Sequence, residues 1–100
     1  MLTHAEIAYI ADEVFAATLG MHGFESADVA DDADLDGSAA VRVTAHFKSG
    51  SEAPEGRAVM AALTGLQARL RAGGEERFAF VRYAYPDDDS PGAEPEDFVP

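Results

Sequence analysis

Cysteine and tryptophan are absent from this chain of 100 residues, and lysine and arginine together number only 7. Without cysteine, the chain has neither a disulfide scaffold nor a cysteine-based metal or redox site. No apolar run approaches the roughly 20 residues of a membrane helix. The first residues also lack the basic start and the apolar stretch of a secretory signal. These absences predict a cytoplasmic protein that contacts no membrane.

Large hydrophobic residues are scarce as well. Hydrophobic residues make up 47% of the chain, but 20 of them are alanine, and Leu, Ile, Val and Phe together number 21. A chain of this length has room for one small core. We therefore expect a single domain that uses its few large residues efficiently or gains buried area by self-association.

Acidic residues dominate the charge, and they are unevenly distributed. The chain has 19 Asp and Glu and a net charge of -12. Residues 1–36 carry nine acids and no Lys or Arg, residues 37–86 carry four acids and all seven bases, and residues 87–100 carry six acids. A chain of this charge repels nucleic acid phosphates, so the composition favours a basic protein as partner.

A helix is predicted over residues 4–19. Thr3 and Glu6 form a capping-box pair at its start, and apolar residues then recur at three- and four-residue spacing. Gly20 suits the left-handed conformation that ends many helices.

Three strands and a second helix are predicted in the rest of the chain. The segment 24–30 indicates a short strand, and a turn containing the hairpin-forming pair 36–37 leads to the clearest alternation, over 41–48. A second helix is expected from about 54 to 72. The strand at 77–85 is apolar on both faces, which is typical of a central strand or a covered face.

The element order is therefore helix, strand, strand, helix, strand. It predicts an α+β fold in which two helices pack on one face of a three-stranded mixed sheet. The second helix would form a right-handed crossover between two parallel strands. We assign this domain to residues 1–86 and expect 87–100 to be a disordered acidic tail.

One face of the sheet is a candidate partner-binding site. If the apolar residues of the strand at 41–48 face the helices, its polar residues face outward. The strand at 77–85 can then be oriented in two ways. In one, two phenylalanines join an outward face that homodimerisation or another partner would use. In the other, they face the helices and the nearby arginine lies at an edge. The candidate residues are Arg42, His46, Phe78, Phe80 and Arg82.

The run Asp32-Ala-Asp34-Leu-Asp36-Gly37 is the sharpest local motif. Carboxylates at every second position before a glycine can wrap a calcium ion, and the run resembles the first half of an EF-hand loop. The position of the bidentate glutamate of such loops holds Val43, inside a predicted strand. A solvated acidic hairpin turn is the simpler interpretation, and a divalent-cation or small-ligand module is the alternative.

The segment Gly20-Met-His-Gly23 and the run Arg77–Tyr83 raise a second alternative. Together with the element order, they resemble bacterial ribosome-maturation factors of the KH-like type, whose GxxG loop contacts the nucleic acid backbone. That resemblance implies an RNA-binding, ribosome-associated factor. The acidic charge, the position of GxxG before a strand and the missing second short helix depart from the family's pattern.

Catalytic motifs are not visible in the sequence. We find no nucleophile elbow, no HExxH and no phosphate-binding glycine-rich loop, and the three histidines share no motif. We therefore expect a non-enzymatic protein without cofactors. It would serve as an interaction module, such as an accessory subunit, an inhibitor or an antitoxin-like neutraliser of a basic partner.

Overall fold

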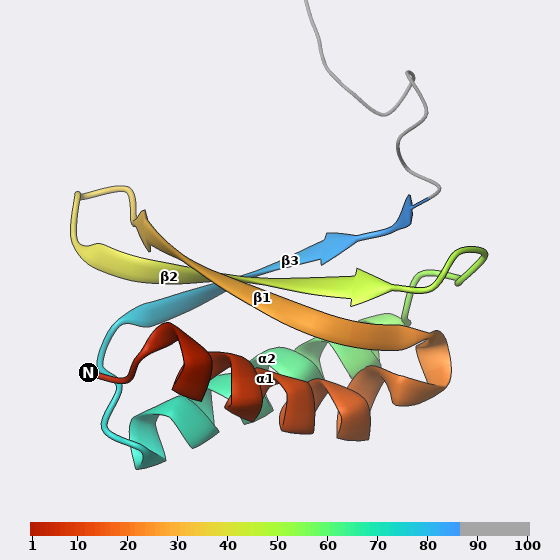
Figure 1. The fold of residues 1–100 in the computed structure, drawn as a ribbon, viewed down its shortest axis with the longest axis horizontal. Helices are drawn as coiled ribbons and strands as arrows, with labels where there is room; N and C mark the ends of the chain where they lie inside the picture. The colour runs from red at the N-terminus through yellow and green to blue at the C-terminus, as the bar shows by residue number, and fades with distance from the viewer. Residues whose placement is uncertain (87–100) are drawn as a thin grey trace, which may run out of the picture.

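Two helices and three strands follow one another along residues 1–86, the part of the chain that the structure, a computed structural model, describes. The predicted acidic tail at 87–100 lies outside the described residues. None of the helices in the described part is long and apolar enough to cross a membrane. The elements are α1 (His4–Leu19), the short 3-10 turn η1 (Gly20–His22), β1 (Phe24–Ala33), β2 (Ala39–Phe47), α2 (Gly56–Ala72) and β3 (Phe78–Ala84) (Figure 1).

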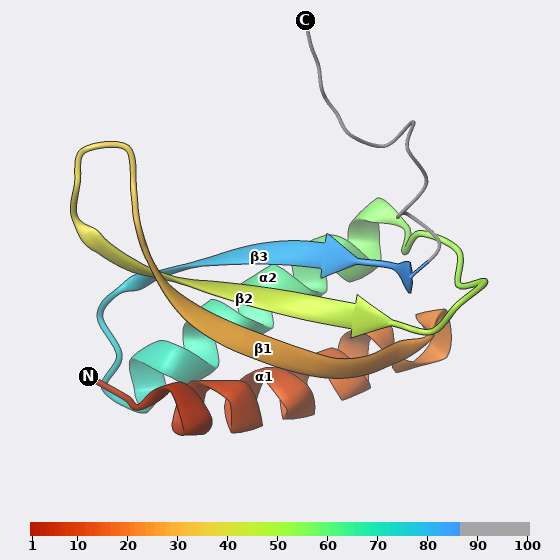
Figure 2. The same ribbon diagram turned by 45° about the horizontal axis from the view of Figure 1, so that its top comes forward.

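The strands form one mixed sheet in the order β1-β2-β3. Strands β1 and β2 are an antiparallel hairpin, whereas α2 carries the chain across to β3, which runs parallel to β2. Both helices lie on the same side of the sheet, as Figures 1 and 2 show from two directions. The predicted fold class and the predicted parallel crossover are thereby confirmed.

Strand β3 lies at an edge of the sheet, and its position corrects one expectation. Its apolar composition on both faces suggested a central strand or a covered face, but β2 is central. Ala79 points to the core and is fully buried, while Phe78 and Phe80 remain exposed. The hydrophobic pattern could not distinguish a covered strand from an edge strand with an uncovered apolar face.

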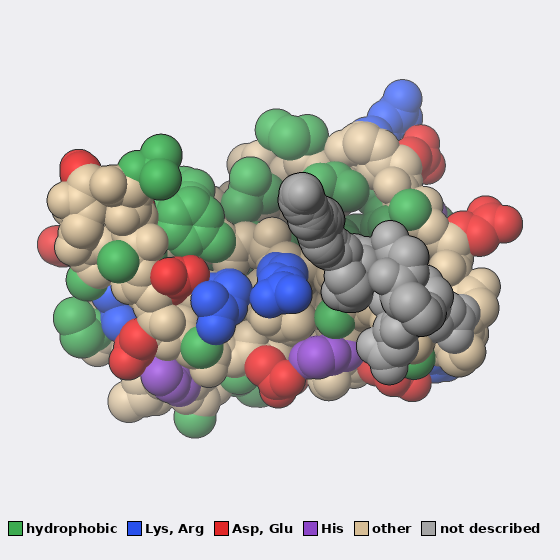
Figure 3. Space-filling model, turned by 90° about the horizontal axis from the view of Figure 1, so that it is seen from above, with side chains coloured by type: hydrophobic (Ala, Val, Ile, Leu, Met, Phe, Trp, Pro, Cys, Tyr) green, Lys and Arg blue, Asp and Glu red, His purple; other side chains and the backbone are tan. Residues whose placement is uncertain are grey.

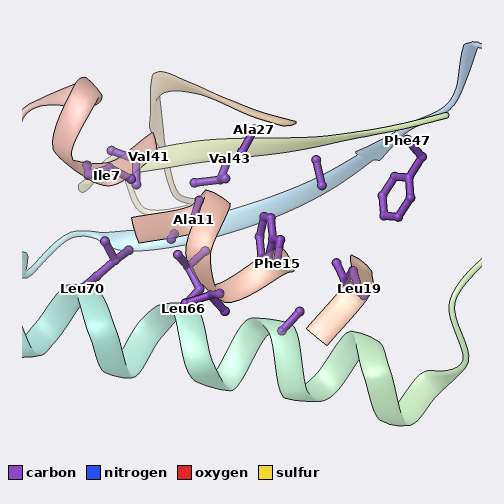
Figure 4. Packing of buried hydrophobic residues seen from close by; sticks show 14 residues of the cluster. Ile7, Ala11, Phe15, Leu19, Ala27, Val41, Val43, Phe47, Leu66 and Leu70 are labelled. Carbon is purple, nitrogen blue, oxygen red and sulfur yellow. The ribbon is translucent and has the colours of Figure 1, made fainter. Parts of the chain in front are cut away.

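The core is a single layer between the sheet and the two helices. It uses the few large side chains that the chain has, and Figure 4 shows Phe15 and Leu66 beneath Val43 and Val41. One end of the layer is aromatic. Phe47 stacks on Tyr83 with ring centroids 5.7 Å apart and meets Phe24 edge to face at 6.1 Å. Such ring pairs add about 1 kcal/mol each to the area that they bury.

The start of α1 is as predicted, and its end is not. Thr3 and Glu6 form the complete capping box. Gly20, however, keeps a helical φ of -59° and begins η1. The left-handed residue is Gly23, with φ of +94°. A Cβ on Gly23 would also lie 2.1 Å from Ser51 Oγ, so glycine is required there by conformation and by space.

A buried ion pair joins the N-terminus to the start of β3. Glu75 is 1% exposed. Its carboxylate accepts hydrogen bonds from the Leu2 backbone N–H at 2.9 Å, from the Arg77 backbone N–H at 2.8 Å and from the Arg77 guanidinium at 2.9 and 3.0 Å. Arg77 in turn donates to the Leu2 carbonyl at 3.2 Å. Every oxygen of the buried carboxylate is thus paired, as burial of a charge requires.

Replacing Glu75 by Gln should lower the free energy of unfolding by about 2 kcal/mol, because the charged hydrogen bonds to Arg77 are lost. Hydrogen bonds from Arg77 lower the pKa of Glu75 from 4.5 to about 2. The stabilisation is therefore full above about pH 4.5 and disappears as the pH falls toward 2. Urea unfolding of the wild type should show this loss. The exposed neighbour Glu76 supplies the control, since Glu76→Gln should change neither stability nor its acid dependence, and equal effects of the two variants would contradict the assignment.

Candidate interaction site on the open sheet face

The face of the sheet turned away from α1 and α2 has no element over it among residues 1–86, and we call it the open face (Figure 1). It is made by every second residue of each strand. All five residues expected at a partner-binding site lie on it, so the structure has the two phenylalanines outward rather than toward the helices. The open face comprises Ser26, Asp28, Ala30 and Asp32 of β1, Ala40, Arg42, Thr44 and His46 of β2, and Phe78, Phe80, Arg82 and Ala84 of β3.

The strand register sets which of these side chains are neighbours. Arg42 of β2 lies opposite Phe80 of β3, and Thr44 lies opposite Arg82. His46 lies opposite Ala84 at the end of the sheet where β2 and β3 finish. The face therefore combines cationic and aromatic groups across two parallel strands, and interface hot spots are enriched in both arginine and aromatic side chains.

Phe78 and Phe80 form an exposed aromatic pair. Their ring centroids are 4.9 Å apart with an interplanar angle of 73°, an edge-to-face contact. The side chains are nevertheless 44% and 36% exposed. Each ring thus keeps much of its apolar surface in water, which is the condition that binding a partner would relieve.

An ion pair and a histidine–carboxylate hydrogen bond join β1 to β2 across the open face. Arg42 Nη1 lies 3.2 Å from Asp32 Oδ2, and His46 Nε2 lies 2.6 Å from Asp28 Oδ2. The side chain of Asp28 remains 76% exposed, and pairs as exposed as these contribute little to stability. The two contacts direct the side chains of Arg42 and His46 toward β1. We had expected Asp32 in a cation-binding run and had not expected Asp28 at this site, although two acids four residues apart, ahead of Arg42 and His46 in the next strand, were a visible signal.

Arg82 differs from Arg42 because no other residue among 1–86 holds its side chain. Its side chain is exposed and forms no hydrogen bond or ion pair with another side chain or backbone group of the described part of the chain. Figure 3 shows Lys and Arg side chains in the middle of this face, with acidic and histidine side chains along one side and hydrophobic ones along the other. The face is therefore graded, from the acidic border at β1 to the apolar border at β3.

The acidic turn between β1 and β2 is organised by its own carboxylates. Asp34 Oδ1 accepts hydrogen bonds from the backbone N–H groups of Asp36 at 3.1 Å and Ser38 at 2.9 Å. Asp32 is instead directed to Arg42. Within residues 1–86 no three His, Asp or Glu side chains are arranged to hold a metal ion. The observed bonds support the structural role of a hairpin turn, and the cation hypothesis has no specific observation in its favour.

The GxxG segment packs against the connection between β2 and α2. The Gly23 carbonyl accepts a hydrogen bond from the Lys48 N–H at 2.9 Å, and Ser51 occupies the space beside Gly23. These contacts give Gly23 a role in turning the chain from α1 into β1, whereas Gly20 keeps a helical conformation and has open space beside it. The contacts account for Gly23 without RNA, whose binding remains a hypothesis.

The fold and the open face define a small α+β domain with one uncovered, aromatic and cationic sheet surface. Comparison of the chain with protein-family models, with curated proteins and with solved structures found no match. The function must therefore be inferred from the geometry of the surface.

Truncating the exposed aromatic pair should cost much less than truncating a core ring. We expect Phe80→Ala to lower the free energy of unfolding by about 1–2 kcal/mol, because the ring contacts Phe78 but lies outside the core. Phe47 supplies the matched comparison, since it is 1% exposed and its truncation should cost about 3–5 kcal/mol. Chemical denaturation measures both. A loss at Phe80 as large as that at Phe47 would show that the open face is a second core surface.

Proposed function

We propose that this chain is a small, acidic, non-enzymatic protein-interaction module, and that it binds a basic protein through the open face. The observation that carries the proposal is the exposed Phe78–Phe80 pair beside the unpaired Arg82. Truncation of aromatic anchors at the centre of an interface commonly costs about 2 kcal/mol or more of binding free energy. Such a module would act as an accessory subunit, an inhibitor or an antitoxin-like neutraliser.

The acidic border at β1 supports a basic partner. The side chain of Asp28 is 76% exposed even though it contacts His46. Its charge therefore faces solvent, on the strand that leads to the turn with Asp34 and Asp36. Exposed charges at the rim of an interface steer association and select the partner more than they add affinity.

Arg42 and His46 would contribute orientation rather than net charge. Because Asp32 and Asp28 hold them on the surface, less side-chain freedom is lost when a partner covers them. Arg82, which has no such partner, is available to a carboxylate, a carbonyl group or an aromatic ring of the bound protein.

The proposal is tested by a pull-down of the tagged chain from its native cells at low salt, followed by affinity measurements with the purified partner. We expect one stoichiometric basic protein that is released at high salt. The double variant Phe78→Ala, Phe80→Ala should bind it at least about tenfold more weakly.

Met21 provides the matched control, since it is 89% exposed and lies on η1, outside the open face. Met21→Ala should bind like the wild type. Recovery of the chain without any partner, or equal affinities of the double variant and Met21→Ala, would contradict the proposal.

A further inference from the structure

The two edges of the sheet are protected to different degrees. At the β1 edge, Asp12 of α1 accepts a hydrogen bond from the Ala27 N–H at 3.0 Å. That strand also has an irregularity between Phe24 and Ser26 and carries several acids. Bulges, charges and covering groups are the devices that prevent strand edges from pairing with other chains. The β1 edge is therefore a protected edge.

The β3 edge has little such protection. Gln67 of α2 donates a hydrogen bond to the Ala79 carbonyl at 2.9 Å, but no other side chain of the described residues bonds to the backbone of β3. The strand contains no proline, glycine or lysine, and Arg82 is its one charged residue. A seven-residue apolar edge strand of this kind is a template for pairing with another strand.

A line of three side chains on α2, two of them apolar, lies beside this edge. Gln67 reaches β3, and Leu63 and Met60 precede it by four and seven residues, so the three side chains lie along the same side of the helix. Met60 is 59% exposed. Above this line, Figure 3 shows hydrophobic side chains along one border of the open face. A strand edge alone is a narrow strip, whereas stable interfaces bury about 800 Å² per partner, and the line on α2 supplies the additional surface.

The β3 strand is complementary to an antiparallel copy of itself. In a two-fold pairing, residues that share the open face must lie opposite one another. A pairing centred on Phe80 places Arg82 opposite Phe78 of the second copy, and one centred on Val81 places it opposite Phe80. Both arrangements give the unpaired guanidinium of Arg82 an aromatic partner.

The charge distribution favours the same pairing. The β3–α2 side belongs to residues 37–86, in which seven bases outnumber four acids. The elements α1 and β1 belong to residues 1–36, which carry nine acids and no Lys or Arg. Pairing at β3 keeps these acidic elements at the two outer ends of the assembly, and pairing at β1 would bring them together against their mutual repulsion.

We propose that two copies of this chain associate through the edge of β3 and the Met60–Gln67 line of α2, forming one six-stranded sheet with a continuous open face. The assembly does not depend on the basic partner proposed above. It would present two copies of the Phe78–Phe80 pair side by side, so a partner with two contact sites would gain avidity.

Sedimentation analysis of the full chain, from micromolar to submillimolar concentration at physiological salt, tests the proposal. We expect a dimer that dissociates on dilution. Met60→Glu should weaken it at least about tenfold, since it introduces a charge on each side of the two-fold contact. Met21→Glu makes the same change at an exposed methionine on η1 and should leave the dimer intact.

Amide hydrogen exchange locates the contact independently. The amides of β3 should become more protected as the concentration rises, while those of β1 should not change. A monomer at all concentrations, equal dimerisation of the two methionine variants, or concentration-dependent protection confined to β1 would overturn the proposal.

Discussion

Both helices of this chain lie on the same face of the sheet, and the rest of the molecule follows from that arrangement. The chain has few large hydrophobic residues, so it builds one core layer and places Phe15, Phe47 and the leucines of α2 there. The other face is left to whatever the alternate strand positions carry. On β1 and β2 these include the Arg42–Asp32 and His46–Asp28 contacts, but on β3 they include two phenylalanines and an unpaired arginine. A surface of that composition is stable in water yet gains from being covered.

Several acidic residues connect elements that are distant in the sequence. Asp12 bonds to the Ala27 N–H and joins α1 to β1, Glu13 pairs with Arg69 and joins α1 to α2, and Glu75 fixes the N-terminus to the start of β3. Most of these contacts are exposed and contribute little individually, whereas the buried Glu75–Arg77 pair strongly constrains the position of its neighbours. Nine of the thirteen acids of residues 1–86 lie within residues 1–36, so the α1–β1 side of the molecule is more acidic than the α2–β3 side.

Local sequence signals predicted the helices and strands well, but they could not predict how these elements contact one another. The capping box and the alternation over 41–48 identified α1 and β2, because these signals act within a few residues. The correct face for Phe78 and Phe80 depended on whether Ala79 or its neighbours faced the helices, and the periodicity of the strand allowed both. The edge position of β3, the roles of Asp28 and Asp32 and the burial of Glu75 depend on contacts between distant segments. No local pattern encodes such contacts without the register of the sheet.

The central claim is that the Phe78–Phe80 pair lies on a solvent-exposed sheet face while the core aromatics do not. Paramagnetic relaxation of aromatic proton signals by a soluble, neutral gadolinium complex measures this directly in the free protein. The account predicts strong relaxation of the Phe78 and Phe80 ring protons and weak relaxation of the Phe15 and Phe47 ring protons. Dimerisation through β3 would leave the open face accessible and would not change this result. Protection of Phe78 and Phe80 equal to that of Phe47 would contradict the account.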